Sequence, residues 1–569
     1  MRAFGSAGLS VKPRRIFRRA APCPWDGWLA TLALGAAAAP LGVPTSALAQ
    51  EGLRLDSTIV GGVLHPTPKR AIGWTVTTID VDDVSRSVPV ATSQELLAGR
   101  VPGLRFTRLT GNLGAGSPMT LRGAGSFDIS RTQPLVYVDG VRVNGDPRAG
   151  PELSSGRSVS VIDDFNLEEV ASIEVLKGPA ATTLYGTEAS AGVVHLRTKR
   201  GIESSPEVSV QVRLGVNYMP DPAGRLGTQW TCPADAVPGP VECQTESGLR
   251  TYNMYDEANE YIRRGYFEWP TDNLFQDGAS RSYDLSVRGG SPSVRYFLSA
   301  NLEDENGVVW YNTDEAFRLR ANVGVTLSNQ LEVDLAAGYV EGDTRFMNAV
   351  PEEGGVWQDL VWSNGYYLDG ITPFGTVGSD PRLGGFQQHL PSDVARVEVT
   401  RDYARFTGSA RLRFTSPEIR LAGVGVSLDS RLILGVDRGR DVNQAIFRLH
   451  DDATPASVSA YCGVRIACAP SSWSAVYGET QVGQLTHERP VSSVYTVDYG
   501  LTADVDAGDS WGSATSFGVQ YVEDRRERLV TSGQGFTSPL ARSLSRSRAW
   551  RRRPSSSRPS RSGSTSRRR

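Results

Sequence analysis

The side chains best suited to chemistry are acidic pairs and histidines. Asp163-Asp164 and Asp451-Asp452 each offer two carboxylates to a cation, although adjacent acidic residues in loops are usually solvated. The five histidines are scattered without the spacing of metal ligands, and we expect His195 to be structural. The glycine-rich stretch that begins at Gly111 lacks the Gly-Lys-Ser/Thr ending of a phosphate-binding loop. No catalytic constellation emerges, so the sequence predicts no enzyme, no bound metal and no cofactor.

The first 49 residues have the composition of an export signal. Basic residues between Lys12 and Arg19 precede an apolar run, and Ala47-Leu48-Ala49 supplies the small-x-small pattern of a cleavage site. The run is too short to span a membrane, and no other segment is apolar enough for a transmembrane helix. We therefore expect export by a cleaved signal peptide, and any passage through a membrane must use strands.

Four of the five cysteines form two close pairs, and the fifth, Cys23, lies in the leader. In an exported chain, closely spaced cysteines in even number indicate local disulfides, here Cys232–Cys243 and Cys462–Cys468. A zinc site is the alternative. Neither pair has the two-residue spacing or the nearby histidines of a zinc site, so we favour disulfides.

Charge is distributed unevenly along the chain. Residues 541–569 contain 11 Arg and no acidic residue, whereas residues 50–540 contain 43 basic and 61 acidic residues, a formal net charge of about −18. The acidic body disfavours nucleic acid as a partner. We interpret the Arg/Ser-rich tail as out-of-frame or disordered sequence, because it is almost free of apolar residues.

Residues 63–203 have the mixed pattern of a compact α+β domain. Helical spacing over Ser93–Val101 predicts a helix with Thr92 or Ser93 as its N-cap. Short apolar runs at Leu135–Asp139 and Ile173–Leu176 predict strands, and Asp139-Gly140 is a strong signal for a tight turn.

From Val208 onward the pattern changes to strict alternation. Val208–Tyr218 places six apolar residues on one face and polar residues on the other, as in a barrel strand between lipid and a wet lumen. Eight similar segments follow: Tyr283–Val287, Val294–Leu302, Phe317–Leu327, Leu331–Tyr339, Tyr403–Phe414, Val426–Val436, Tyr495–Val505 and Thr515–Tyr521. Their connections alternate between long and short, as extracellular loops and periplasmic turns do. The long ones, which contain both cysteine pairs, are Met219–Ser282, Glu303–Ala316, Val340–Asp402 and Asp437–Val494.

Four motifs resemble the plug domain of TonB-dependent receptors. They are LLAGRVPGLRF (Leu96–Phe106), GAGSPMTLRGAGSF (Gly114–Phe127), PLVYVDGVRVN (Pro134–Asn144) and SIEVLKGPAATTLYGTEASAGVVHLRTKRG (Ser172–Gly201). The last looks like the SusC/RagA branch more than the siderophore branch. The resemblance implies an α+β plug domain inside an antiparallel transmembrane β-barrel of about 22 strands in the cell outer membrane. Only about nine strands can be identified, within residues 204–540, so we expect a truncated copy that cannot form a working pore.

The resemblance also implies which plug residues matter. They are Arg122, Gly123, Asp139, Gly140, Glu174, Lys177, Gly178, Tyr185, Gly186 and Gly192. We expect the last three glycines to need positive φ or a close backbone approach. The charges at Arg122, Glu174 and Lys177 either pair with the barrel lumen, holding the plug reversibly, or pair inside the plug and only stabilise it.

A short segment within residues 50–62 resembles a TonB box, the flexible stretch that the TonB energising complex captures by strand addition. It consists of Asp56, Ser57, Thr58, Ile59 and Val60. An ordinary linker would have much the same composition, so both interpretations stay open.

Two functions follow. The first is TonB-dependent import of a nutrient, an oligosaccharide or peptide rather than a siderophore, with a SusD-like surface lipoprotein as partner and outer-membrane lipid around the barrel. The second is a non-transporting receptor or adhesin that binds ligand at its long loops. Aromatic residues in those loops suit sugar stacking, but aromatic girdles at a membrane interface use the same residue types. They are Trp230, Trp357, Trp362, Tyr366, Tyr367 and Trp473.

Overall fold

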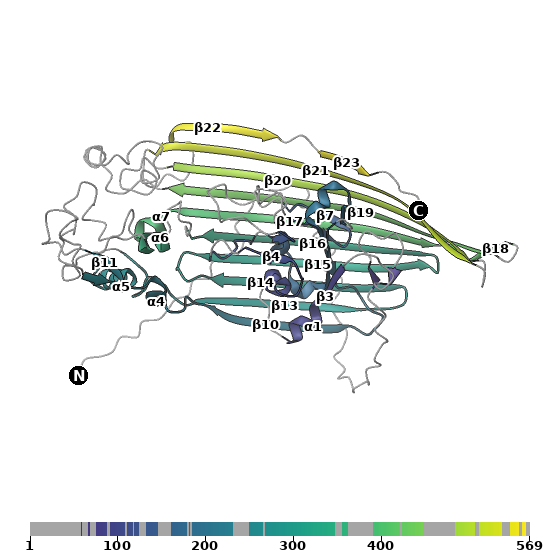
Figure 1. Cartoon of the computed structure of the whole chain (residues 1–569), viewed down its shortest axis with the longest axis horizontal. Coiled ribbons are helices and arrows are strands. Elements are labelled where there is room, and N and C mark those ends of the chain that lie inside the picture. The colour runs from purple at the N-terminus through teal and green to yellow at the C-terminus, as the bar shows by residue number, and fades with distance from the viewer. Residues whose placement is uncertain are drawn as a thin grey trace, which may run out of the picture. The chain divides into compact units, whose positions relative to one another are not determined.

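The computed structural model describes residues 58–59, 67–68, 76–87, 92–107, 111–117, 119–123, 133–145, 161–178, 181–182, 185–231, 250–265, 268–347, 356–361, 391–421, 424–447, 484–506, 511–536, 547–556 and 560–564. Both predicted disulfides, the leader, Asp451-Asp452 and most of the TonB-box-like segment lie outside these residues. The described chain has two parts. A small mixed domain within residues 76–201 is called the plug, and one large antiparallel sheet within residues 207–564 is called the wall (Figure 1).

The plug is built on a five-stranded sheet in the order β3-β8-β9-β6-β7. Its strands are β3 (Val76–Asp80), β8 (Val170–Leu176), β9 (Val193–Thr198), β6 (Leu135–Val138) and β7 (Val141–Val143). The β6–β9 pair is parallel and the other pairs are antiparallel. A second small sheet pairs β4 (Leu104–Phe106) with β5 (Met119–Leu121), and two short helices are α1 (Val81–Ser87) and α2 (Ser93–Leu97). The predicted α+β architecture is confirmed.

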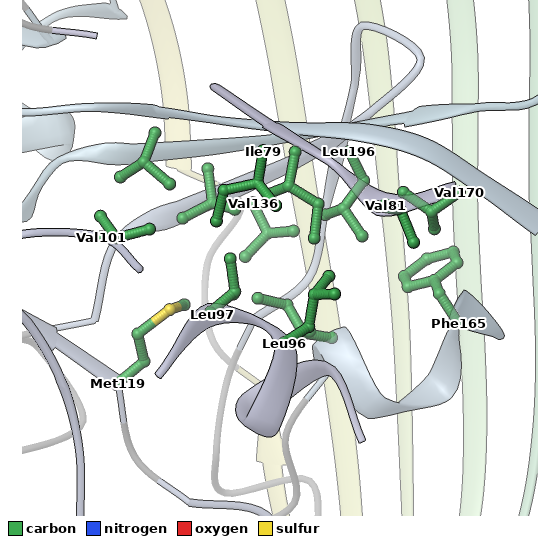
Figure 2. Packing of buried hydrophobic residues seen from close by; sticks show 14 of the residues in the cluster. Ile79, Val81, Leu96, Leu97, Val101, Met119, Val136, Phe165, Val170 and Leu196 are labelled. Atoms are coloured by element: carbon green, nitrogen blue, oxygen red, sulfur yellow. The ribbon is translucent and has the colours of Figure 1, made fainter. Parts of the chain in front are cut away.

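An apolar core joins the sheet to α2. Figure 2 shows Leu96 and Leu97 on α2 facing Ile79, Val136 and Leu196 on the sheet. Both leucines are fully buried, as is Ile173 on β8. Burying a side chain of this size contributes about 1.5–3 kcal/mol, so the core holds the plug together as one folded body.

Local signals in the plug act where the sequence places them. The Thr92 side chain accepts a hydrogen bond from the Glu95 amide at 3.2 Å and is the N-cap of α2. The helix ends at Leu97, earlier than predicted, and Gly99 then has φ +75°. Asp139 and Gly140, with φ of 51° and 91°, make the two-residue turn between β6 and β7. Two successive positive φ values match the twist that a tight hairpin needs.

The wall is a 12-stranded sheet whose long strands follow chain order (Figure 1). They are β10 (Glu207–Asn217), β13 (Gly278–Gly290), β14 (Val294–Asn306), β15 (Thr313–Ser328), β16 (Leu331–Phe346), β17 (Glu398–Thr415), β19 (Val424–Phe447), β20 (Gln484–Asp506) and β21 (Gly512–Phe536). Eight of the nine predicted strand segments fall within one of them, and Val208–Tyr218 extends one residue past the end of β10. Short β18 (Ile419–Leu421) pairs with β19.

The two faces of the wall differ in polarity as the alternation predicts. On the outer face, Val208, Val210, Val212, Leu214, Val216 and Tyr218 are all exposed, Leu214 by 73%. On the inner face, Asn301, Arg320, Arg405 and Asp437 are buried beneath the plug or against neighbouring strands. The outer face therefore offers an apolar surface, and the inner face offers hydrogen-bonding groups to the plug.

Strands extend beyond their predicted ends on the side of the long connections. The predicted long connection Glu303–Ala316 is wrong, because β14 continues to Asn306 and β15 begins at Thr313. Along this extension the outer face is no longer apolar. Glu315, Asp343 and Asp402 lie directly opposite one another on β15, β16 and β17. These three residues are called the acidic row.

Helices gather beyond this end of the strands (Figure 1). They are α4 (Pro222–Leu226), α5 (Met254–Arg264), α6 (Val356–Val361) and α7 (Pro391–Arg396), beside a hairpin of β11 (Gln229–Thr231) and β12 (Arg250–Tyr252). Their own apolar cluster includes Met254, Leu360 and Val394, all fully buried. No helix in the described residues is long and apolar enough to cross a membrane.

Part of the Arg/Ser-rich tail is in strand conformation. β22 (Ser547–Ser556) and β23 (Ser560–Ser564) both pair antiparallel with β21. These segments differ from the disordered tail that composition predicts, because an unpaired strand edge offers hydrogen bonds to any following chain regardless of its side chains.

Candidate functional site

One plug segment, residues 161–169, reaches four strands of the wall and is called the docking segment. It contains two short 3-10 turns, Val161–Asp164 and Leu167–Glu169. Asn166 caps the second turn, because its side chain accepts a hydrogen bond from the Glu168 amide at 3.1 Å. The same side chain donates to Asp284 on β13 at 2.6 Å. The cap thus fixes the turn and anchors it to the wall.

Arg405 on β17 is the most heavily bonded of these wall contacts. Its Nε and Nη2 donate to the two carboxylate oxygens of Asp437 on β19, at 2.7 and 2.8 Å. Its Nη1 donates to Asp164 of the docking segment at 2.8 Å, and Nη2 also donates to the Asn144 carbonyl at 3.0 Å. Because all of these groups are buried, the guanidinium shares its charge between one wall carboxylate and one plug carboxylate.

Two arginines of β15 also contact the plug. Arg320 donates from Nε to Glu169 at 3.0 Å and lies 3.6 Å from Asp139. Arg318 donates to Asn301 at 2.8 Å and to the Asp164 carbonyl at 3.3 Å. The acidic docking segment therefore lies on a group of wall arginines, and opposite charges set its position.

Weaker polar contacts join plug and wall at both ends of the strands. Near the short turns, Arg200 pairs with Asp334 at 2.7 Å. Toward the long connections, the Leu113 amide donates to Asn312 at 3.1 Å, and the Met347 amide donates to Asn112 at 2.6 Å. Hydrogen bonds and ion pairs therefore recur over the whole height of the plug.

This geometry would allow the plug to separate from the wall without unfolding. The polar contacts described above join groups that water also solvates well, so their separation exchanges one set of polar partners for another. A lost apolar contact has no such replacement in water. The arrangement favours displacement at the interface over disruption of the plug core.

The charged plug residues predicted from the sequence lie elsewhere. Glu174 pairs with Arg197 at 2.8 Å, and Lys177 donates to the Pro102 carbonyl at 2.9 Å, both inside the plug. Arg122 has φ 58° and its amide donates to the Gly103 carbonyl. Burial and the nearby Arg122 lower the pKa of Lys177. The alternative that these charges stabilise the plug internally is the one the contacts support.

The docking residues were missed by sequence reasoning. Asp163-Asp164 was expected to be solvated, yet Asp164 is buried and ion-paired. The only signal available was polar residues at alternate positions of β15, β17 and β19. That signal indicates a polar face of the sheet, but it does not identify which wall residue contacts which plug residue.

The predicted glycines do adopt positive φ: 67° at Gly178, 79° at Gly186 and 99° at Gly192. Gly123, at 98°, does so as well. Asp139 accepts hydrogen bonds from the Thr198 amide at 3.0 Å and hydroxyl at 2.6 Å, so it ties the β6–β7 turn to the end of β9. The part these residues play in any transport stays a prediction.

His195 is structural in its contacts. Its Nε2 and the Tyr185 hydroxyl share a hydrogen bond of 2.6 Å, and its ring stacks on Tyr137 at 5.1 Å. Burial, reinforced by Arg197 and Arg431, lowers the pKa of His195 to about 3. The imidazole is therefore neutral at physiological pH.

Two other predicted features are described only in part. Thr58 and Ile59 of the TonB-box-like segment form β1 and pair antiparallel with Thr67 and Pro68 of β2. Among the loop aromatics, Trp357 packs against Phe275 at 6.1 Å within the helical cluster, so this tryptophan serves packing. Among the described residues no group of His, Cys, Asp or Glu could hold a metal ion.

Comparisons with known proteins agree with this architecture. Residues 68–193 match the family model for the TonB-dependent Receptor Plug Domain. Over 304 residues the chain is 24% identical to the TonB-dependent receptor SusC of Bacteroides thetaiotaomicron, covering 53% of this chain and 28% of SusC. Over 289 residues it is 26% identical to the TonB-dependent receptor P26 of Formosa agariphila, covering 50% of this chain and 26% of that protein.

Among solved structures, the RagAB peptide importer in the open-open state matches with a TM-score of 0.58 and 16% identity, covering 89% of this chain and 53% of that one. The chain thus spans little more than a quarter of the two curated relatives and about half of the solved chain. The fold is shared, and the SusC/RagA-like resemblance inferred from the plug motifs is confirmed.

Proposed function

We propose that this chain is part of a SusC/RagA-like TonB-dependent receptor that, with a complete barrel, serves active import of a nutrient across the outer membrane. The plug closes the path while it is seated on the wall. Force applied to the N-terminal segment around Ile59 would unseat it. The observation that carries the proposal is the docking of an acidic plug segment on wall arginines through Arg405–Asp164 and Arg320–Glu169.

The proposed partners follow from the same architecture. A TonB-type energising complex would capture the Asp56–Val60 segment by strand addition. A SusD-like surface lipoprotein would cover the end of the wall that carries α4 to α7. An oligosaccharide or peptide is the proposed cargo, and the RagAB relative is named a peptide importer.

A reversible crosslink between plug and wall tests the proposal. Asp164→Cys with Arg405→Cys, in a background whose native cysteines are Ser, places two thiols at positions that the long Arg405 side chain now bridges. Because a cysteine is much shorter than an arginine, the thiols lie beyond disulfide reach and are joined by a thiol-reactive crosslinker whose spacer contains a cleavable disulfide. Both substitutions are made in a fusion of this chain with the remaining barrel strands of a relative. Crosslinking should abolish uptake of a labelled peptide or oligosaccharide, and reductive cleavage of the spacer should restore it.

The matched control is Arg413→Cys with Asp429→Cys, which crosslinks β17 to β19 within the wall and leaves the plug free. Control protein treated with the same crosslinker should still import. Import that continues with the Asp164–Arg405 crosslink formed would contradict a moving plug.

The alternative is a receptor or adhesin that binds ligand at its long connections while the plug stays seated. Deleting Asp56–Val60 separates the two functions. Import predicts that uptake disappears while surface binding survives. Unchanged uptake after the deletion would instead show that the segment is an ordinary linker.

A further inference from the structure

A cavity of about 420 Å³ lies between plug and wall, near the short-turn ends of the strands. Tyr137, Tyr185 and His195 line it from the plug, and Arg411, Arg431 and Ile433 line it from β17 and β19. It is separate from the docking segment and from the helical cluster beyond the long-connection end. A volume of this size accommodates a small organic molecule.

Most arginines around the cavity make direct ion pairs. Arg197 pairs with Glu174 at 2.8 Å, and Arg200 pairs with Asp334 at 2.7 Å. Arg431 pairs with Asp498, at 3.3 Å.

Arg411 is the exception, since it makes no ion pair within the described residues. Its Nη2 donates only to the Asp139 carbonyl, at 3.1 Å, and its buried Nε has no hydrogen-bond partner. The Asp139 carboxylate is already committed to Thr198 and lies 3.6 Å from Arg320. The Arg411 guanidinium beside the cavity is therefore held by one carbonyl and contacts no carboxylate directly within the described residues. A carboxylate bound in the cavity would supply the charge-assisted hydrogen bonds that this guanidinium lacks.

The other side of the cavity is aromatic and lies beside the Arg431–Asp498 pair. The rings of Tyr137 and Tyr185 lie 5.0 Å apart, and the neutral His195 ring lies 5.4 Å from Tyr185. The Ile433 side chain closes on the β6–β7 turn, because a Cβ at Gly140 would lie 3.0 Å from its Cδ1. A flat or apolar group is suited to this surface.

We propose that this cavity binds a small organic carboxylate, with the carboxylate on Arg411 and the apolar part of the molecule against Tyr137 and Ile433. The site goes beyond the proposed import, because binding needs no movement of the plug and no energising partner. Its place at the short-turn end makes it distinct from ligand capture at the long connections.

Calorimetry on the full chain folded in detergent micelles tests the site, with benzoate as the probe. Benzamide has the same ring without the charge and should bind at least about tenfold more weakly, since a charge-assisted hydrogen bond contributes about 1.5–3 kcal/mol. Arg411→Gln should weaken benzoate by a similar factor. Arg411→Lys, which keeps the charge but loses the planar fork, should fall between the two.

Arg413→Gln is the matched control. It lies two residues along β17, is exposed, pairs with Asp429 and does not line the cavity, so benzoate affinity should stay unchanged. Ile433→Trp replaces the apolar contact with a larger side chain that narrows the cavity, and it should weaken binding with every charge retained. Far-ultraviolet circular dichroism checks that each variant is folded.

Three results would overturn the proposal: no saturable benzoate binding to the unaltered chain, equal binding of benzamide, or full benzoate affinity in folded Arg411→Gln or Ile433→Trp. Inorganic phosphate that binds as tightly as benzoate would also overturn it, because the aromatic side would then contribute nothing. None of these readouts involves uptake, so the cavity and the import proposal fail independently.

Discussion

The core of the plug and its interface with the wall are held by opposite kinds of contact. Inside the plug, Leu96, Leu97 and Ile173 are fully buried among other apolar side chains. Between plug and wall, Arg405 and Arg320 bind Asp164 and Glu169 through hydrogen-bonded ion pairs. Apolar contacts keep a body intact in water, whereas polar contacts can be exchanged for water. The plug therefore has a stable apolar core, and it is held to the wall by polar contacts that water can replace.

Arg405→Leu should give the largest effect. Removing one partner of a buried ion pair leaves Asp437 and Asp164 uncompensated, which costs about 3–5 kcal/mol. Hydrogen exchange followed by mass spectrometry should show the docking segment exchanging far faster while β8 stays protected. Arg413→Leu, which breaks an exposed pair, should change exchange little. Equal loss of exchange protection in β8 would mean that the docking segment and the plug core unfold as one cooperative unit.

Ile173→Ala tests the other side of the comparison. The residue is fully buried in β8, so its truncation should destabilise the plug by about 2–5 kcal/mol. Here β8 and β3 should lose protection together with the docking segment, because a melted plug cannot remain docked. A substitution that freed the docking segment alone would contradict the assignment of Ile173 to the core.

His195 gives a pH-dependent test at the edge of the core. Its pKa is about 3 in the folded plug, below the ordinary value of 6.5, so only the unfolded chain takes up the proton as pH falls through this window. Stability should therefore decrease on acidification, by about 2 kcal/mol between pH 7 and pH 5. Urea denaturation of the unaltered chain and His195→Gln at both values measures it. The variant should lose this component, and an unchanged pH dependence would exclude His195 as its source.

Thr92→Ala should give the smallest of these effects. It removes the side-chain cap of α2 at the Glu95 amide and should cost about 1 kcal/mol. Thr92→Ser, which keeps the hydroxyl, is the control. Since α2 carries Leu96 and Leu97, exchange should rise in the helix and not in the docking segment. A serine variant as unstable as the alanine variant would argue against capping.

The sequence was informative where structure depends on near neighbours. The Asp139-Gly140 hairpin, the Thr92 cap and the alternation from Val208 to Tyr218 all follow from residues a few positions apart. The contacts between the docking segment and the wall were not predictable in this way. Arg405 and Asp164 are 241 positions apart, and alternation says only that Arg405 faces inward. The side chain that it meets depends on how the plug sits against the wall.

The strand ends failed for another reason. Alternation is visible only where one face is apolar, and beyond Leu302 on β14 both faces carry polar residues. Glu303–Ala316 therefore resembles a loop in composition although most of it is strand. The end of the alternating pattern is the end of the apolar surface rather than of the strand.

In the proposed outer-membrane setting, the acidic row marks the level on the wall at which the hydrocarbon layer would end. Leu331, Val333, Leu335, Ala337 and Tyr339 alternate on the outer face of β16, a rise of nine residues that matches the 9–11 or so residues a tilted strand needs to cross hydrocarbon. Asp343 follows two pairs of residues later, level with Glu315 and Asp402. Three adjacent carboxylates are not stable in hydrocarbon. The boundary between hydrocarbon and water would therefore cross the wall between Tyr339 and Asp343. The residues beyond this level, including the last part of the strands and the helical cluster, would lie in the aqueous phase.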